Sequence, residues 1–224
     1  MPSKKQQRRE SEILMHLAIR NHRVDEVAQR LRDGADPNAF DDRNILTGTP
    51  YALTALCTAI STAAHTISPE RAAIAEVNRE LFPDSPPHDI RGERARSIEI
   101  IHLLLSAGAD PNLPTRTRTP LSLAAFTGDM ELVTLLLDSG ADVSGPCWSP
   151  LSSRRQTKGG VGFHGNAIHE AVEKGRAAVV SLLCSRGADV SARNDAGKTA
   201  LDLAVERGHS EVVRILQEHE SHVA

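Results

Sequence analysis

The sequence predicts an all-α protein built from stacked pairs of short helices. Three observations indicate this fold class. Short apolar runs with helical spacing recur, each bounded by a capping residue and a glycine. The same pattern returns at a fixed separation along the chain. Aromatic residues make up only 3% of the 224 residues, so the core must be built mainly from Leu, Ala, Ile and Val.

The clearest helix pair spans residues 119–140. Thr119 is a good N-cap, and Pro120 at the first helical position loses no useful donor. Gly128 ends this run because glycine takes left-handed backbone angles at little cost. Asp129 then caps a second apolar run. Neither helix is long enough to be stable alone, so we expect the pair to bury its apolar face against similar pairs.

Equivalent pairs occur elsewhere in a constant register. The distance from the opening residue to the closing glycine is 21 residues in the pairs that begin at Ile13, Thr119 and Asn166. A last copy opens at Thr199, which is 33 residues after Asn166. Another copy opens at Thr54 and is longer by 33 residues. The chain therefore contains about five copies of one unit.

These copies resemble ankyrin repeats. The TPLHLAA motif of that family is matched by Thr119–Ala125, and its LLLxxGADVN motif by Leu135–Ser144 and Leu103–Asn112. The resemblance covers roughly residues 11–219 and implies an ankyrin-repeat solenoid of helix-turn-helix pairs joined by finger loops. It implies little about function, because one fold serves many functions.

The register predicts the following organisation. We expect a disordered basic arm over residues 1–10, a single repeat domain over 11–220 and a tail over 221–224. The arm, with Lys4, Lys5, Arg8 and Arg9, has the composition of a nuclear-import or phosphate-binding tail, or of a solvated terminus. The repeats are expected at about 11–38, 49–112, 114–144, 161–192 and 193–220, with a long finger at 145–165.

The first repeat is a degenerate end copy. Ser11 is expected to cap its first helix. The residues expected to face inward are Ile13, Leu14, Leu17 and Ala18. The outer face of a terminal repeat must tolerate water, and five charged residues could supply it: Arg20, Arg23, Asp25, Glu26 and Arg30.

The second repeat is interrupted by an insertion at 61–95. The spacing of its apolar residues predicts an extra helix over 70–82, and the second helix of the repeat is expected to resume at Ser97. The alternative is a decayed sixth repeat, with residues 87–107 in register with 119–139. That register would bury Asp89, Arg91 and Glu93, so an insertion is favoured.

The three cysteines indicate a reducing compartment, the cytoplasm or the nucleus, because their number is odd and their spacing wide. Cys57 and Cys184 fall on core positions, where a thiol behaves as a small hydrophobe. Cys147 could instead be a reactive thiol. No run approaches the 18 or more apolar residues of a membrane span, so no membrane contact is expected.

Two patterns point weakly to chemistry. Residues 160–165 form a G-x-G-x-x-G motif, but no predicted strand precedes it, so a nucleotide site is not favoured. His164, His169 and Glu170 resemble part of a zinc pattern, but the histidines are five rather than four residues apart. His169 also occupies the His position of the family motif, where a hydrogen bond that ties the turn is expected. We therefore predict no catalytic residue, cofactor or metal.

The resemblance implies that partners bind on the concave side, which is made of finger tips and the inner face of the first helices. By position, that surface takes in Arg116, Arg118, Phe126, Glu173, Lys174, Lys198, Glu206 and Arg207. The long finger adds Trp148, Arg154, Arg155, Lys158 and Phe163, and contains no acid. A tryptophan beside arginines has the composition of a binding hot spot, although a loose segment whose Trp packs on the neighbouring repeat is the alternative.

Charge favours one class of partner. The whole chain carries −3, while the arm carries +3, the finger at 113–119 carries +2 and the long finger +3, so the rest carries −11. We therefore expect a monomeric, non-enzymatic module that binds an acidic or mixed-charge segment of another protein. A nucleic-acid binder is the alternative, but the pI of 6.4 argues against it. An enzymatic or nucleotide-binding role depends on the glycine motif alone.

Overall fold

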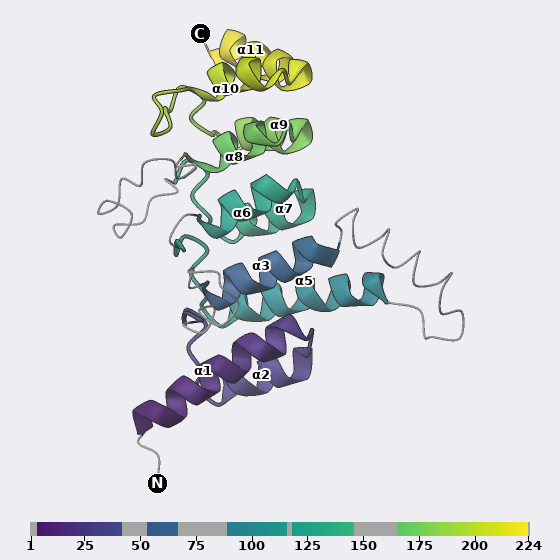
Figure 1. Ribbon diagram of the computed structural model, residues 1–224, viewed down its shortest axis with the longest axis vertical. Coiled ribbons are helices and arrows are strands. Elements are labelled where there is room, and N and C mark those ends of the chain that lie inside the picture. Colours follow the sequence, from purple (N-terminus) through teal and green to yellow (C-terminus); the bar gives the residue numbers. More distant parts are fainter. Residues whose placement is uncertain (1–3, 42–52, 67–88, 116–117, 146–164, 224) are drawn as a thin grey trace. The chain divides into compact units, whose positions relative to one another are not determined.

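The described residues of the chain are helical apart from their connections. In this computed structural model they are 4–41, 53–66, 89–115, 118–145 and 165–223. The chain forms two compact units, Met1–Ala109 and Asp110–Ala224 (Figure 1). The first contains α1 (Lys4–Arg20), α2 (Val24–Arg32), α3 (Ala55–Thr66) and α5 (Ile90–Ser106). The second contains α6 (Pro120–Thr127), α7 (Met130–Asp138), α8 (Ala167–Glu173), α9 (Ala177–Ser185), α10 (Ala200–Arg207) and α11 (Ser210–Val223).

The second unit is three helix hairpins stacked in two layers. The hairpins are α6 with α7, α8 with α9, and α10 with α11 (Figure 1). The first helices pack in one layer, α6 on α8 and α8 on α10, and the second helices pack in the other, α7 on α9 and α9 on α11. Leu121, Leu132, Leu136, Ile168 and Leu183 lie in the core between the layers, each at most 1% exposed. The prediction of an all-α repeat fold is confirmed.

The caps predicted for the first hairpin are present. The Thr119 hydroxyl accepts a hydrogen bond from the Ser122 amide at 3.2 Å, and Pro120 occupies the first helical position. Gly128 adopts a left-handed conformation, with φ of 82°, and the Asp129 carboxylate caps α7. These local signals explain why the chain forms two short helices here rather than one long helix.

Replacing Thr119 with alanine should lower the free energy of unfolding by about 1 kcal/mol, because an amide at the start of α6 loses its acceptor. Thr134→Ala makes the same chemical change inside α7, where alanine is the better helix former. Thermal melting should show a lower Tm for the first variant and an equal or higher Tm for the second. Equal losses in both would mean that the cap hydrogen bond adds no stability.

Within each unit, an asparagine side chain bonds to the backbone of the next Gly-Ala-Asp segment. The Asn112 side-chain amide donates to the Gly140 carbonyl at 3.1 Å, and the Asp142 amide donates to the Asn112 side-chain oxygen at 2.7 Å. In the first unit the Asn38 side chain makes the same bond to the Gly108 carbonyl, at 3.2 Å. The repeated Gly-Ala-Asp segments therefore fix the spacing between neighbouring repeats.

The N-terminal helix corrects the prediction of a disordered arm over residues 1–10. Helix α1 already begins at Lys4, so residues 4–10 are helical and Ser11 is not a cap. Its Lys, Gln, Arg and Glu residues are good helix formers, and Arg8 forms ion pairs with Glu12 and Asp36. The packed part of the helix supplies the nucleus, so extension by these residues costs little.

The inward face of α1 was predicted correctly at Ala18, which is buried, but not at two of the leucines. Leu14 and Leu17 are each 41% exposed, whereas Met15 and Ile19 are buried. Helix α1 packs on α2 and α3 through the face that carries Met15, Ala18 and Ile19. The sequence pattern alone could not separate two neighbouring apolar stripes on one helix.

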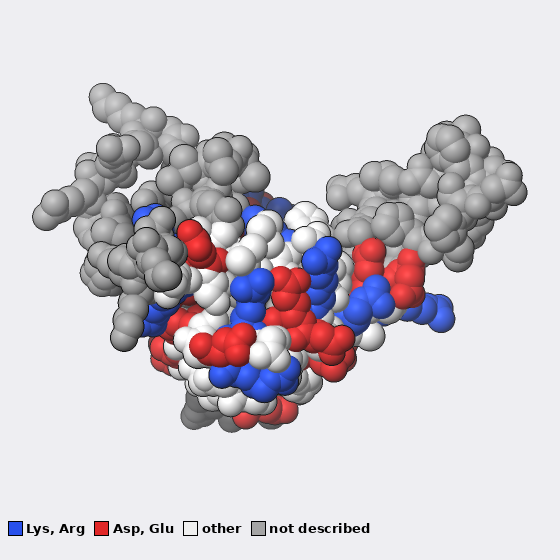
Figure 2. All heavy atoms as spheres, turned by 90° about the horizontal axis from the view of Figure 1, so that it is seen from below, with Lys and Arg blue, Asp and Glu red and all other residues white. Residues whose placement is uncertain are grey.

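The outer surface of α1 and α2 carries mixed charge. Figure 2 shows acidic and basic side chains interspersed on this side of the molecule. Glu26 forms ion pairs with Arg23 at 3.3 Å and Arg30 at 2.8 Å, and Asp25 is exposed. Exposed pairs of this kind contribute little to stability, so their main effect is to make the end of the repeat array compatible with water.

The second repeat is a long hairpin of α3 and α5. Helix α3 continues to Thr66, and α5 begins at Ile90 with Asp89 as its cap. The predicted insertion at 61–95 is therefore too long at both ends, and the resumption of the second helix at Ser97 was placed seven residues too late. Helix α5 also runs unbroken through the position where a decayed sixth repeat would need its turn, so that alternative is wrong. The helix predicted over 70–82 lies outside the described residues.

Among the residues that the structure describes, no helix has both the length and the apolar character needed to cross a membrane. The described cysteines follow the prediction. Cys57 and Cys184 are buried in the core as free thiols, and burial raises the pKa of Cys57 to about 12. Neither is therefore a reactive thiolate at neutral pH.

Candidate binding surface

Seven of the predicted partner-binding residues lie in the second unit. They are Arg118, Phe126, Glu173, Lys174, Lys198, Glu206 and Arg207. The others, Arg116, Trp148, Arg154, Arg155, Lys158 and Phe163, lie outside the described residues, as do Cys147, His164 and most of the glycine motif. The structure therefore places the first group and leaves the long finger as a prediction.

The ends of the first helices bring these residues together. Phe126 is in the last turn of α6, Glu173 ends α8 with Lys174 as its C-cap, and Glu206 and Arg207 end α10. Because these helices pack side by side, their ends form one continuous strip. We call these five residues, with Arg118 and Lys198 from the adjoining fingers, the inner row.

Both fingers are closed by hydrogen bonds beside the inner row. The Thr115 amide donates to the Arg118 carbonyl at 2.8 Å, and the Thr115 hydroxyl donates to the same carbonyl at 2.9 Å. The Asn194 amide donates to the Lys198 carbonyl at 3.0 Å. The base of each finger is thus fixed, and it holds Arg118 and Lys198 at defined positions next to the helices.

A buried carboxylate orients Arg118. Its guanidinium donates from Nε and Nη2 to the two carboxylate oxygens of Glu170, each at 3.2 Å. The Glu170 side chain is only 1% exposed, whereas that of Arg118 is 30% exposed. Burial raises the pKa of Glu170, and the hydrogen bonds from Arg118 oppose that shift. The sequence pattern indicated Glu170 only as a possible metal ligand, and this role could not be predicted because its partner lies in the preceding repeat.

Three cationic side chains converge on Phe126. The Arg118 guanidinium lies 4.1 Å from the ring centroid and the Lys174 ammonium 4.7 Å from it. Arg176 donates from Nε to the Phe126 carbonyl at 3.5 Å. Arg176 was not predicted, although its position in the turn after α8, two residues beyond Lys174, could have suggested it. The aromatic face provides a favourable place for positive charge.

Ion pairs neutralise the rest of the inner row. Arg207 contacts both oxygens of the Glu173 carboxylate, through Nε at 2.9 Å and Nη2 at 2.6 Å. Lys198 pairs with Glu206, and its hydrogen bond lowers the pKa of that carboxyl. Positive charge without a carboxylate partner is therefore concentrated at Phe126 rather than spread along the row.

His169 ties the turn before α8, as predicted. Its Nδ1 lies 2.6 Å from the Asn166 side-chain oxygen, and its Nε2 lies 3.3 Å from the Lys198 carbonyl. Burial lowers its pKa, so the neutral ring is favoured. Within the described residues, no group of three or more His, Cys, Asp or Glu side chains is arranged to hold a metal ion.

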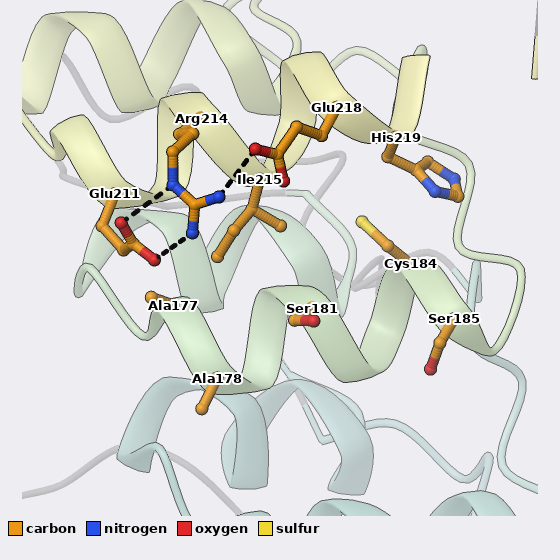
Figure 3. Close-up of a pocket in the computed structure, with 10 residues that line it drawn as sticks. All are labelled: Ala177, Ala178, Ser181, Cys184, Ser185, Glu211, Arg214, Ile215, Glu218 and His219. Atoms are coloured by element: carbon orange, nitrogen blue, oxygen red, sulfur yellow. Dashed lines mark hydrogen bonds and ion pairs between the residues drawn. The ribbon is translucent and has the colours of Figure 1, made fainter. Parts of the chain in front are cut away.

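Away from the inner row, a groove with a volume of about 600 Å³ lies between α9 and α11. Figure 3 shows Arg214 between Glu211 and Glu218, with Ile215 and Cys184 lower in the groove. Both acids are committed to Arg214, and burial raises the pKa of the Cys184 thiol. Glu211 and Glu218 are therefore not free to act as a general base, and Cys184 is not a reactive thiolate.

Two family models match the sequence. The model of three ankyrin repeats matches residues 151–224, and the model of a single ankyrin repeat matches residues 117–146. Together they cover the three hairpins of the second unit.

Similar proteins have diverse descriptions. Cyclin-dependent kinase 4 inhibitor B of Bos taurus is 31% identical over 131 residues, which is 58% of this chain and 89% of that protein. A putative ankyrin repeat-containing protein of Treponema pallidum is 36% identical over 55% of this chain and 37% of its own length. The probable E3 ubiquitin-protein ligase XBOS34 of Oryza sativa subsp. japonica is 38% identical over 45% of this chain and 17% of its own length.

The alignments thus span well under half of the last two relatives but nearly all of the kinase inhibitor. That small relative consists of little beyond the matched region. Its coverage, the two family models and the repeated helix hairpins agree with one another. The chain belongs to the ankyrin repeat family.

Proposed function

We propose that this protein is a non-enzymatic interaction module that binds another protein through the inner row and the adjoining fingers. The observation that carries the proposal is the cluster at Phe126. An aromatic side chain on a helix end, flanked by Arg118 and Lys174, has the composition of a protein-binding hot spot. Ankyrin repeat proteins in general act by binding other proteins.

The chemistry of the inner row supports binding rather than catalysis. The two carboxylates of the inner row, Glu173 and Glu206, and the buried carboxylate of Glu170 beneath it are each paired with a cation of the row. A general base must instead be free to take a proton from a substrate. Such paired charges are suited to fixing side-chain geometry and to selecting a complementary surface.

The similar proteins suggest two forms of this function. One relative is by name an inhibitor of a cyclin-dependent kinase, so regulation of an enzyme by direct binding is one form. Another is by name a probable ubiquitin ligase, in which a repeat segment could serve as an adaptor. We propose a monomeric binder or adaptor in the cytoplasm or nucleus, with repeats close to the predicted limits and the long finger at 145–165 as a second contact region.

Affinity capture with charge-reversed baits tests the proposal. The Lys174→Glu/Arg207→Glu variant should lose most of the partner captured by the intact chain, because two cations of the inner row are reversed. The matched control is Arg186→Glu/Arg214→Glu, which makes the same charge change at the C-cap of α9 and on α11. Thermal melting of each bait would establish that it is folded.

A partner retained by the inner-row variant and lost by the control would contradict the proposal. A third bait without residues 146–164 tests the long finger separately. Loss of the partner with that deletion alone would assign recognition to the finger rather than to the inner row.

A further inference from the structure

The charge around Phe126 is unbalanced. Arg118 has the Glu170 carboxylate as its counter-ion. Lys174 and Arg176, within the described part of the chain, form no ion pair, although both contact Phe126 through its ring or its carbonyl. The cluster therefore combines three cations with one anion, and that anion is 1% exposed.

The neighbouring repeat shows the opposite arrangement. Arg207 is neutralised by Glu173, and Lys198 by Glu206. These acids are directed to Arg207 and Lys198, and neither forms an ion pair with Lys174 or Arg176 in the described part of the chain. Positive charges held near one aromatic ring repel each other, and that repulsion falls when an anion binds between them.

Arg118 is oriented before any ligand arrives. The Glu170 carboxylate accepts hydrogen bonds from Nε and Nη2 of Arg118, and these two bonds fix the plane of the guanidinium. A guanidinium has five N–H donors, so others remain for a ligand. The Phe126 ring supplies an apolar surface below these donors. Lys174, which is exposed, adds a flexible cation at the edge.

We propose that Arg118, Lys174 and Arg176 form a seat for the carboxylate of a Glu or Asp side chain in a partner protein. This assignment deepens the proposed function and rests on it. The seat accepts a single acidic side chain, whose carboxylate contacts the cations while its methylene groups lie on Phe126. Charge-assisted hydrogen bonds to Arg and Lys would hold it.

The flanking acids favour an acidic peptide over a nucleic acid. Glu173 and Glu206 lie in the same row, with side chains 20% and 48% exposed. A phosphate backbone that followed the row would meet these carboxylates after leaving the seat. A peptide can place one acid in the seat and neutral or basic residues opposite Glu173 and Glu206.

NMR titration of the ¹⁵N-labelled full chain tests the seat. The probe is the acetylated, amidated tripeptide Glu-Leu-Glu, and its Gln-Leu-Gln analogue is the uncharged control. The Glu peptide should produce saturable shifts at Phe126, Lys174 and the Arg176 Nε–H group. The Gln analogue should produce none at the same concentration.

The variants make the result specific. Lys174→Glu should weaken binding of the Glu peptide about tenfold or more, whereas Arg186→Glu, with the same charge change at the C-cap of α9, should bind as the wild type does. Shifts that are equal for both peptides, or that survive Lys174→Glu, would overturn the seat. A single-stranded oligonucleotide that displaces the peptide at low concentration would also overturn it and indicate a polyanion site.

The seat and the proposed function can fail separately. If the tripeptide does not bind at Phe126 but the inner-row variant still loses its captured partner, the function stands and the carboxylate seat is wrong. If the tripeptide binds but the partner is retained by that variant, the anion seat exists and the function assigned to the inner row is wrong.

Discussion

Leu136→Ala is expected to lower the free energy of unfolding by about 2–5 kcal/mol. Leu136 is fully buried in α7. Its removal leaves a cavity in the core between the two helix layers of the second unit, which the stacked helices fill only partly. Repeat proteins depend on contacts between neighbours, so a cavity in α7 weakens its packing on α6 and on α9. The loss is a large share of a typical stability of about 5–15 kcal/mol.

Urea unfolding followed by circular dichroism would measure this loss. Leu137→Ala is the matched control, because the same atoms are removed from a neighbouring half-buried position. The control should lose clearly less stability than Leu136→Ala. A similar loss in both variants would mean that the assignment of the α7 face to the core is incorrect.

Arg118→Met is expected to destabilise the fold by about 1–3 kcal/mol at neutral pH. Removing one partner of a buried ion pair leaves the other charge uncompensated, which costs about 3–5 kcal/mol when both are buried. The expected loss of stability is smaller here because the Arg118 side chain is 30% exposed and its ion pair with Glu170 is partly screened by solvent. Methionine keeps much of the length and apolar volume of the arginine side chain, so the effect reports mainly the lost charge.

The loss of stability caused by Arg118→Met should depend on pH. Burial raises the pKa of Glu170 above its ordinary value of 4.5, and Arg118 opposes the shift, so Arg118→Met should raise that pKa further. When folding raises the pKa of a carboxyl group, the stability contributed by that group is fully present at pH values below the pKa of the unfolded state. This contribution is lost as the pH rises through the pKa of the folded state. The difference between variant and wild type should therefore be small near pH 4.5 and largest at neutral pH.

Glu170→Gln provides the control for this prediction. In the Arg118→Met background it removes the buried charge, so the double variant should recover stability at neutral pH and lose the added pH dependence. Chemical unfolding of all four proteins at both pH values completes the double-mutant cycle. A pH-independent loss in Arg118→Met would mean that Glu170 is not its cause.

Local signals in the sequence predicted much of the fold. Thr119, Asp129 and Gly128 define the ends of α6 and α7 within a few residues, and the repeat spacing predicted the equivalent hairpins. The register also identified Cys57 and Cys184 as buried. These features depend on neighbouring residues or on the period, both of which a single sequence contains.

The errors arose where tertiary contacts decide the structure. Helix α1 extends back to Lys4 because the rest of the helix is anchored, and the apolar stripe it buries is the one that meets α2 and α3. The partner of Arg118 could not be predicted, since Glu170 lies 52 residues away. Arg176 was missed for a similar reason, because its contact with Phe126 crosses from one hairpin to the next.

Hydrogen exchange of the chain bound to its captured partner would show whether the inner row is the binding surface. We expect added protection over residues 118–127, 170–176 and 198–207, which contain the inner row and Arg176. The groove between α9 and α11 serves as the internal control and should exchange as in the free chain. Protection confined to α9 and α11, with none at the ends of α6, α8 and α10, would contradict the account.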